Sequence, residues 1–365
     1  MKVLSLFSGV GGFDMGLEAA GMETVFQCEY DKHCLNVLER HWPDVPRWGD
    51  VSTLTGAYIL KHAPVIDVIA WGSPCQDLSV AGKRAGLEGN RSSLFHEGIR
   101  IINELRELTN GQYPRISIWE NVVGALSSNK GADFGLILDS FSECGSLVIE
   151  WSVLDAQHFG VPHRRRRVFV LAAFDPSIAD RCPNPLLPVA RSMPGNSATS
   201  KTKRKSVTRT TSESIGSNNG LNDSVLFENS YRDGARIAHG GVTQTLSAKM
   251  GTGGLNTPMI ATAYSIREDA KANNFSATEL DYANSLSALQ PSTQSHHAQM
   301  FIAEQTMAVR RLTPLECERL MGWPDDHTKY RADGTTQSDT ARFKQIGNGV
   351  ASPVAKWVAK QIIKL

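Results

Sequence analysis

Short apolar runs recur along the first 175 residues, and stretches with helical spacing separate them. The runs at 2–7, 23–28, 65–71, 115–119, 147–154 and 167–173 predict strands. Between them, residues 13–20, 32–41, 92–108 and 134–142 place apolar side chains along one side of a helix. Strands that alternate with helices form βαβ units, so we predict an α/β fold with a mostly parallel sheet and helices on both faces.

The pattern changes after Asp175. Residues 189–223 are rich in Ser, Thr, Asn, Gly and Lys, a composition that buries too little apolar surface to become ordered by itself. Residues 224–305 favour strands and turns, and helical periodicity returns at 313–321 and 353–365. We predict a first domain over 1–185, a smaller β-rich domain over 186–330 with a flexible basic segment at 189–223, and a segment 331–365 that returns to the first domain.

Composition and charge narrow the class of protein. Of the 365 residues, 41% are hydrophobic and 21% are charged, as in soluble globular proteins, and no apolar run is long enough to cross a bilayer. The six cysteines show no CxxC pair and no zinc-ligand spacing, which favours reduced thiols, a cytoplasmic protein and no metal site. A net charge of +1 argues against a general polyanion binder, but local basic clusters at 164–167 and 201–209 fit phosphate contacts along one face. For the cluster at 201–209, a solvated charge run is the favoured reading.

A glycine turn joins the first predicted strand to the first helix. Residues 6–13 read Leu-Phe-Ser-Gly-Val-Gly-Gly-Phe, and such a turn lets backbone N–H groups and a helix N-terminus approach a ligand. The turn is not GxGxxG and no P-loop lysine follows, which argues against NAD or ATP.

Glu29 ends the second strand, where an acid accepts hydrogen bonds from ribose hydroxyls. Beside it Tyr30 offers a ring face for an adenine, and Asp50 is able to accept from its amino group. Taken singly, each acid is better explained as a solvated loop residue.

Three further segments carry groups that suit covalent chemistry. Trp-Gly-Ser-Pro-Cys-Gln at 71–76 places Cys75 on a turn after a strand, where a thiolate becomes a nucleophile if its pKa is lowered; a structural cysteine is the alternative. Glu120 follows the predicted strand 115–119, where an apolar setting raises a carboxyl pKa and suits an acid. An exposed loop glutamate is the alternative there. Arg165 and Arg167 alternate as a strand begins, so they share one face and suit contact with a carboxylate, a base or a phosphate. Their alternative is a surface basic patch.

These segments, together with Arg-Leu-Thr-Pro-Leu-Glu at 311–316, Arg-Leu-Met-Gly-Trp-Pro at 319–324 and Gln-Ile-Gly-Asn-Gly-Val at 345–350, resemble the ordered motifs of the C5-cytosine DNA methyltransferases. The resemblance covers 3–173 and 310–361. It implies a Rossmann-like methyltransferase sheet that binds S-adenosylmethionine, beside a smaller β-rich target-recognition domain. The chain departs from the family pattern at His163, where glutamine is common, at Ser92, where glycine is usual, and at Gly349, where serine is frequent.

By matched position, the resemblance implies roles for individual residues. Cys75 would attack C6 of a flipped cytosine, Glu120 would hold N3 and the exocyclic amine, and Arg165 and Arg167 would face the base. The implied pocket for S-adenosylmethionine is lined by Phe7, Gly9, Gly11, Gly12, Glu29, Tyr30, Asp50, Pro74, Leu94 and Asn348.

The resemblance also implies a substrate and partners. The substrate would be double-stranded DNA, whose target base must leave the stack because C6 is shielded within a duplex. We expect the protein to be a monomer. We also expect it to belong to a restriction–modification system. Three alternatives stay open: an RNA cytosine-5 methyltransferase, a non-catalytic DNA-binding relative, and a nicotinamide dehydrogenase. The intact Cys75, Glu120 and Arg165 argue against the second, and the missing GxGxxG argues against the third.

Overall fold

The computed structural model describes residues 1–74, 93–180, 186–187 and 312–364, together with the backbone of six short strands between 225 and 311. Cys75, Ser92 and the predicted flexible segment at 189–223 lie outside the described residues.

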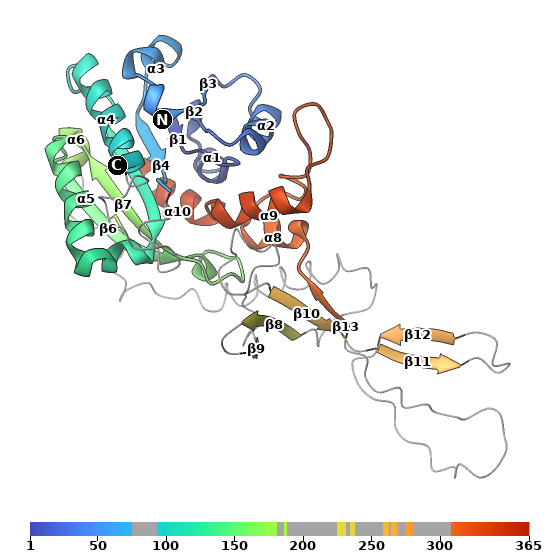
Figure 1. Ribbon diagram of the computed structural model, residues 1–365. Coiled ribbons are helices and arrows are strands. Elements are labelled where there is room, and N and C mark those ends of the chain that lie inside the picture. Colours follow the sequence, from blue (N-terminus) through green and yellow to red (C-terminus); the bar gives the residue numbers. More distant parts are fainter. Residues whose placement is uncertain are drawn as a thin grey trace, which may run out of the picture.

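A seven-stranded sheet forms the centre of the structure (Figure 1). Its strand order is β3-β2-β1-β4-β5-β7-β6. The strands are β1 (Lys2–Leu6), β2 (Glu23–Cys28), β3 (Arg47–Trp48), β4 (Val68–Trp71), β5 (Ile116–Val122), β6 (Val148–Asp155) and β7 (Arg166–Ala173). All six predicted strands are present, and the two-residue β3 is additional because so short a strand leaves no periodicity in the sequence.

The direction of the last strands differs from the βαβ expectation. β1 to β5 pair in parallel, whereas β7 runs antiparallel to both β5 and β6. Only the short 3-10 helix η4 (Ala156–His158) lies in the connection between β6 and β7. A connection that short cannot hold the crossover helix that a parallel pair needs, so β7 returns beside β6 as a hairpin.

Helices cover both faces of the sheet (Figure 1). They are α1 (Gly12–Glu18), α2 (Lys32–His41), α3 (Gly56–His62), α4 (Ser93–Leu108), α5 (Ala132–Glu143), α6 (Pro176–Ala179), α8 (Pro314–Leu320), α9 (Asp339–Asn348) and α10 (Ser352–Ile363), with two further 3-10 helices, η1 (Val51–Thr53) and η3 (Val123–Gly131). The sequence predicted α1, α2, α4, α5, α8 and α10 but not α3, α9 or the four-residue α6. α3 has only seven residues, and α9 buries mostly polar side chains, so neither shows an apolar stripe.

Two apolar cores lie on opposite faces of the sheet. Alternate strand residues point to each face, so Val3 and Val68 belong to one core and Leu4 and Ile69 to the other. Side chains of α1, α8 and α10 fill the first core, and those of α3, α4 and α5 fill the second.

The second domain stays a prediction. The described strands between 225 and 311 form a four-stranded sheet of order β13-β10-β8-β9 and a separate hairpin of β11 and β12. These strands are β8 (Val225–Ser230), β9 (Gly234–Ile237), β10 (Pro258–Thr262), β11 (Tyr264–Glu268), β12 (Phe275–Glu279) and β13 (Ala308–Arg311). The predicted boundary at 330 would include α8 in the second domain, whereas Cys317, Leu320 and Met321 pack in the first core of the large sheet.

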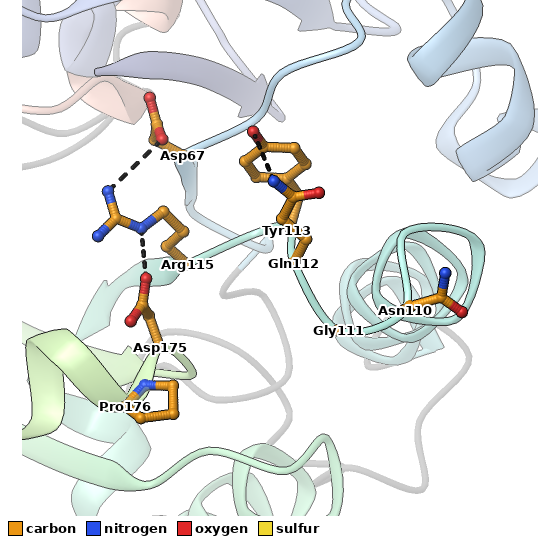
Figure 2. Close-up of a pocket in the computed structure, with 8 residues that line it drawn as sticks. All are labelled: Asp67, Asn110, Gly111, Gln112, Tyr113, Arg115, Asp175 and Pro176. Atoms are coloured by element: carbon orange, nitrogen blue, oxygen red, sulfur yellow. Dashed lines mark hydrogen bonds and ion pairs between the residues drawn. The ribbon is translucent and has the colours of Figure 1, made fainter.

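A polar pocket of about 430 Å³ lies at the end of the sheet where β4 and β5 begin (Figure 2). Arg115 lies in it between two carboxylates: its Nε donates to Asp175 Oδ2 at 2.6 Å, and its Nη1 is 3.8 Å from Asp67 Oδ1. Asp67 also accepts from the backbone N–H of Lys2 at 2.8 Å. Because these carboxylates already have protein partners, we interpret the cluster as a clamp that joins the starts of β1, β4 and β5 to the end of β7.

Removing the charge of Asp175 is expected to weaken this clamp. Hydrogen bonds from Ser177 and Arg115 lower the pKa of Asp175 from 3.8 to about 2. Asp175→Asn keeps the side-chain cap of α6 but loses the ionic bond, so we expect a loss of about 1 kcal/mol at pH 7 in urea unfolding. A depressed pKa stabilises the fold above pH 3.8, so the difference between variant and parent should shrink as the pH falls from 3.8 towards 2. A difference that stays constant over that range would contradict the ionic contribution.

Candidate active site

The predicted site residues that the structure describes lie at the carboxyl-terminal end of the parallel strands, opposite to the end of the sheet that carries the polar pocket. β1, β2, β3, β4 and β5 run parallel, so their carboxyl ends meet there, and the antiparallel β7 begins at the same edge. The glycine turn follows β1, Glu29 follows β2, Asp50 lies after β3, Pro74 after β4, Glu120 near the end of β5, and Arg165 and Arg167 at the start of β7. The chain leaves the described residues at Pro74, one position before Cys75.

The turn after β1 has a backbone that explains its glycines. Gly9 and Gly11 have φ angles of +57° and +81°, in the region that favours glycine. An added Cβ on Gly12 would lie 2.6 Å from the backbone oxygen of Val350, so the start of α1 packs directly on the segment before α10. Phe7 also has a positive φ, of 53°, which is uncommon for a bulky residue and marks local strain at this edge.

Glu29 connects this turn to the end of β2. Its Oε2 accepts from the backbone N–H of Gly9 and its Oε1 from that of Asp31, both at 2.7 Å. Burial raises the pKa of Glu29, while the two backbone N–H groups act against that rise. The neighbouring Tyr30 ring is 77% exposed and therefore free to stack on a planar group. Asp50 is exposed, and its Oδ1 accepts from the backbone N–H and hydroxyl of Ser52 at the start of η1.

The remaining predicted pocket residues come from the helices. Leu94 is half-buried in the first turn of α4, and Asn348 is exposed at the last residue of α9. The departure at Gly349 has a structural reason, because an added Cβ there would lie 2.5 Å from the ring of Trp323. The Nε1 of Trp323 donates to the backbone oxygen of Val350 at 3.0 Å, so the indole occupies the space that a serine side chain would need.

Glu120 is buried and paired with Arg167. The sequence predicted a strand that ends at 119, but β5 continues to Val122 because 120–122 pair with 167–169 of β7. Arg167 lies diagonally across the strand pair, with its Nε 3.1 Å from Glu120 Oε1. Burial raises the pKa of Glu120, and the charges of Arg167 and then Arg165 lower it less, so the pKa stays above its usual value. A carboxyl of this kind holds a proton more readily than an exposed glutamate.

Arg165 lies in a different environment from Arg167. It is buried, and its Nη2 donates to the backbone oxygens of Gly347 at 3.1 Å and Gly349 at 2.6 Å. These bonds tie the start of β7 to the residues on either side of Asn348. His163 is fully buried nearby, and burial together with the positive charges of Arg165 and Arg167 keeps its pKa well below 6.5. His163 is therefore neutral at pH 7.

Sequence reasoning overlooked the residues that hold the chain between β4 and Cys75. The side chains of Trp119 and Asn121 both donate to Ser73, and all three residues are buried. Ser73 stands in the quoted segment 71–76, two residues before Cys75, and Asn121 directly follows Glu120. These positions beside the candidate reactive groups were the available signal, but the contact between Ser73 and Asn121 depends on the pairing of β4 with β5.

The sheet, the glycine turn and the acid at the end of β2 define a Rossmann-like methyltransferase. The solved structure of the S. pombe Dnmt2 methyltransferase has the same fold: it is 15% identical in sequence, with a TM-score of 0.61 over 100% of this chain and 98% of that one. The predicted fold class is confirmed.

The model of the C-5 cytosine-specific DNA methylase family matches residues 1–364, and the chain belongs to this family. The Type II methyltransferase M.Bsp6I of Bacillus sp. is 26% identical over 100% of this chain and 99% of its own length. A protein of Escherichia phage P1 named DNA N-6-adenine-methyltransferase is 25% identical over 99% of this chain, which spans 61% of that protein. The predicted family and enzyme class are confirmed, and the family implies a methyl donor and a DNA substrate. Among the described residues, no helix is long and apolar enough to cross a membrane.

Proposed function

We propose that this chain transfers a methyl group from S-adenosylmethionine to C5 of a cytosine in double-stranded DNA, with Cys75 as the nucleophile. The observation that carries the proposal is the buried Glu120, paired with Arg167 beside the turn that leads into Cys75. An acid with a raised pKa and a thiol four residues beyond the end of the neighbouring strand β4 suit addition to a pyrimidine ring, in which N3 gains a proton as C6 gains a bond.

In the proposed reaction, the thiolate of Cys75 forms a bond to C6 and Glu120 gives its proton to N3. The electron pair of the C5–C6 double bond shifts towards C5 and makes this carbon a nucleophile. In unmodified cytosine, C5 is too poor a nucleophile to take a methyl group. Arg167 stabilises the carboxylate that Glu120 becomes after this proton transfer. It is also the better candidate to contact the carbonyl oxygen of the cytosine. After C5 has taken the methyl group, it loses its proton to water, and the C5–H electron pair re-forms the C5–C6 double bond and expels the thiolate of Cys75. N3 then returns its proton to the carboxylate of Glu120, which restores the acid. Arg165 would face the base as well, and its bonds to the backbone oxygens of Gly347 and Gly349 would hold the segment around Asn348.

S-adenosylmethionine supplies the methyl group as a sulfonium, and the residues after β1, β2 and β3 fit its nucleoside. Each oxygen of Glu29 accepts one backbone N–H, which leaves each a lone pair for a ribose hydroxyl. An added Cβ on Gly9 meets no atom of the described residues within 4 Å, which supports an open side of the turn for a ligand. The pocket would be completed by the other predicted residues: Phe7, Gly11, Gly12, Tyr30, Asp50, Pro74, Leu94 and Asn348.

Recognition of the DNA sequence would belong to residues 186–330, with 1–185 and 331–365 as the catalytic and cofactor-binding parts. A target base must leave the helix for C6 to be attacked, and a second domain across the DNA would hold the duplex open. The names of the relatives called Type II methyltransferases support a place in a restriction–modification system.

The proposal is tested by incubating the purified chain with labelled S-adenosylmethionine and either duplex DNA of mixed sequence or RNA of the same sequence. We expect label in 5-methyldeoxycytidine after digestion of the DNA to nucleosides, and bisulfite sequencing should locate it. Label in RNA alone would favour the RNA methyltransferase, and label in N6-methyladenine would contradict both the thiol chemistry and the choice of base.

A further inference from the structure

The end of β4 is held by hydrogen bonds that no step of the proposed reaction uses. The Nε1 of Trp119 donates to the hydroxyl of Ser73 at 3.2 Å. The Nδ2 of Asn121 donates to the backbone oxygen of Ser73 at 3.3 Å and lies 3.4 Å from its hydroxyl. Ser73, Trp119 and Asn121 are 6%, 0% and 2% exposed, so their polar groups form hydrogen bonds with one another instead of with water.

Strand alternation explains why the acid and this cluster come from adjacent residues. In β5, Trp119 and Asn121 point to one face of the sheet and Glu120 to the other. Residues 72 and 73 match this alternation. Gly72 faces the acid, since an added Cβ would lie 3.2 Å from Glu120 Oε2, and Ser73 faces Trp119 and Asn121. Gly72 and Ser73, which precede Cys75 in the sequence, are therefore positioned against β5 on both faces of the sheet.

We propose that Ser73 is a positioning residue, which through Trp119 and Asn121 sets where the chain leaves β4 relative to Glu120. This inference rests on the proposed function, because it concerns the distance between the thiol of Cys75 and the acid of Glu120. Cys75 follows Ser73 by two residues in the sequence, so the position of Ser73 sets where the chain that carries the proposed nucleophile starts. A displacement of about 1 Å in a reacting group is enough to cost up to about 100-fold in rate.

The same two strands provide a matched control. Two positions earlier, the Nε1 of Trp71 donates to the hydroxyl of Ser117 at 2.9 Å, and both residues are fully buried. This bond has the same chemistry and burial as the bond between Trp119 and Ser73, but Trp71 is already held by the ladder between β4 and β5, whereas Ser73 lies beyond the last paired residue. Ser73→Ala and Ser117→Ala should therefore each leave one buried indole N–H without its acceptor and lower stability by similar amounts.

The test measures the single-turnover rate of covalent adduct formation with a 5-fluorocytosine duplex in the presence of S-adenosylmethionine. We expect Ser73→Ala to lower this rate about 10- to 100-fold, with the dissociation constants of DNA and S-adenosylmethionine changed less than about twofold. Ser117→Ala should keep the parent rate. Trp119→Phe removes the indole N–H donor together with part of the buried ring, so we expect it to slow the adduct as well, and the double variant Ser73→Ala with Trp119→Phe to be no slower than the slower single variant.

Equal rates in the Ser73→Ala and Ser117→Ala variants, whether both unchanged or both reduced, would overturn the positioning role. If Ser73→Ala does not fold, Trp119→Phe decides in its place: a parent rate for that variant overturns the role. The result also separates the two proposals. A parent protein that forms no adduct contradicts the proposed function, whereas a parent that reacts at the rate of its Ser73 variant contradicts only the positioning.

Discussion

Cys75→Ala is expected to lower methyl transfer by about 10⁴-fold or more, because no other group in the site would make C5 a nucleophile. The pocket proposed for the methyl donor consists of other residues, so the variant should bind S-adenosylmethionine with the affinity of the parent. Transfer is measured with labelled methyl groups and binding by calorimetry.

Trapping provides a second measurement on the same variant. A duplex with 5-fluorocytosine has no C5 proton to lose, so the parent should remain covalently attached to it, and peptide mapping should find the adduct at Cys75. Cys317→Ala serves as a control, since burial keeps that thiol protonated by raising its pKa. An adduct that still forms in the Cys75 variant would remove the assigned nucleophile.

Glu120→Gln is expected to lower kcat by about 10²- to 10⁴-fold, the range for loss of a positioned acid. Glutamine keeps the size of the side chain and one acceptor, but it cannot give a proton to N3. The burial that raises the pKa of Glu120 also predicts a pH dependence, because the protonated acid is lost as the pH rises through that pKa. The parent should therefore lose kcat/KM on the alkaline side of this pKa, and the variant should lack that limb.

The matched comparison is Glu150→Gln. Glu150 lies on β6, where its Oε2 accepts from the backbone N–H groups of Leu186 at 2.7 Å and Leu187 at 3.0 Å, far along the chain from the acid proposed here. We expect this variant to affect stability and to leave the pH profile unchanged. A Glu120 variant whose kcat stays within twofold of the parent would assign the proton transfer to another group.

How much of the site could be predicted depends on the range of the interactions. The strand end that precedes Glu29 was predictable, because an apolar run that stops at a polar residue marks the end of a buried element. The strand end near Glu120 was predicted too early, because β5 continues through the polar Glu120 and Asn121 to Val122. The partners were not predictable. Arg167 pairs with Glu120 because β7 runs antiparallel to β5, and the sequence pattern had indicated a mostly parallel sheet.

The same limit applies to the departures from the family pattern. Gly349 was noted as a missing serine, but its reason is the indole of Trp323, which lies 26 residues earlier in the chain. Arg165 was expected at the base, and its bonds to the backbone oxygens of Gly347 and Gly349 became visible only once α9 was in place. Neither contact leaves a periodic signal, because each joins two elements through single residues.

The sequence by itself determined the alternation of strands and helices and the glycine turn, since these depend on the local order of apolar and polar residues, and it supplied the reactive groups proposed here. The tertiary structure decided which of those groups meet: the pairing of Glu120 with Arg167, the position of Arg165, and the hold of Trp119 and Asn121 on Ser73. The physical reason is that side-chain periodicity reports which face of an element is buried, whereas strand direction and register decide what that face contacts.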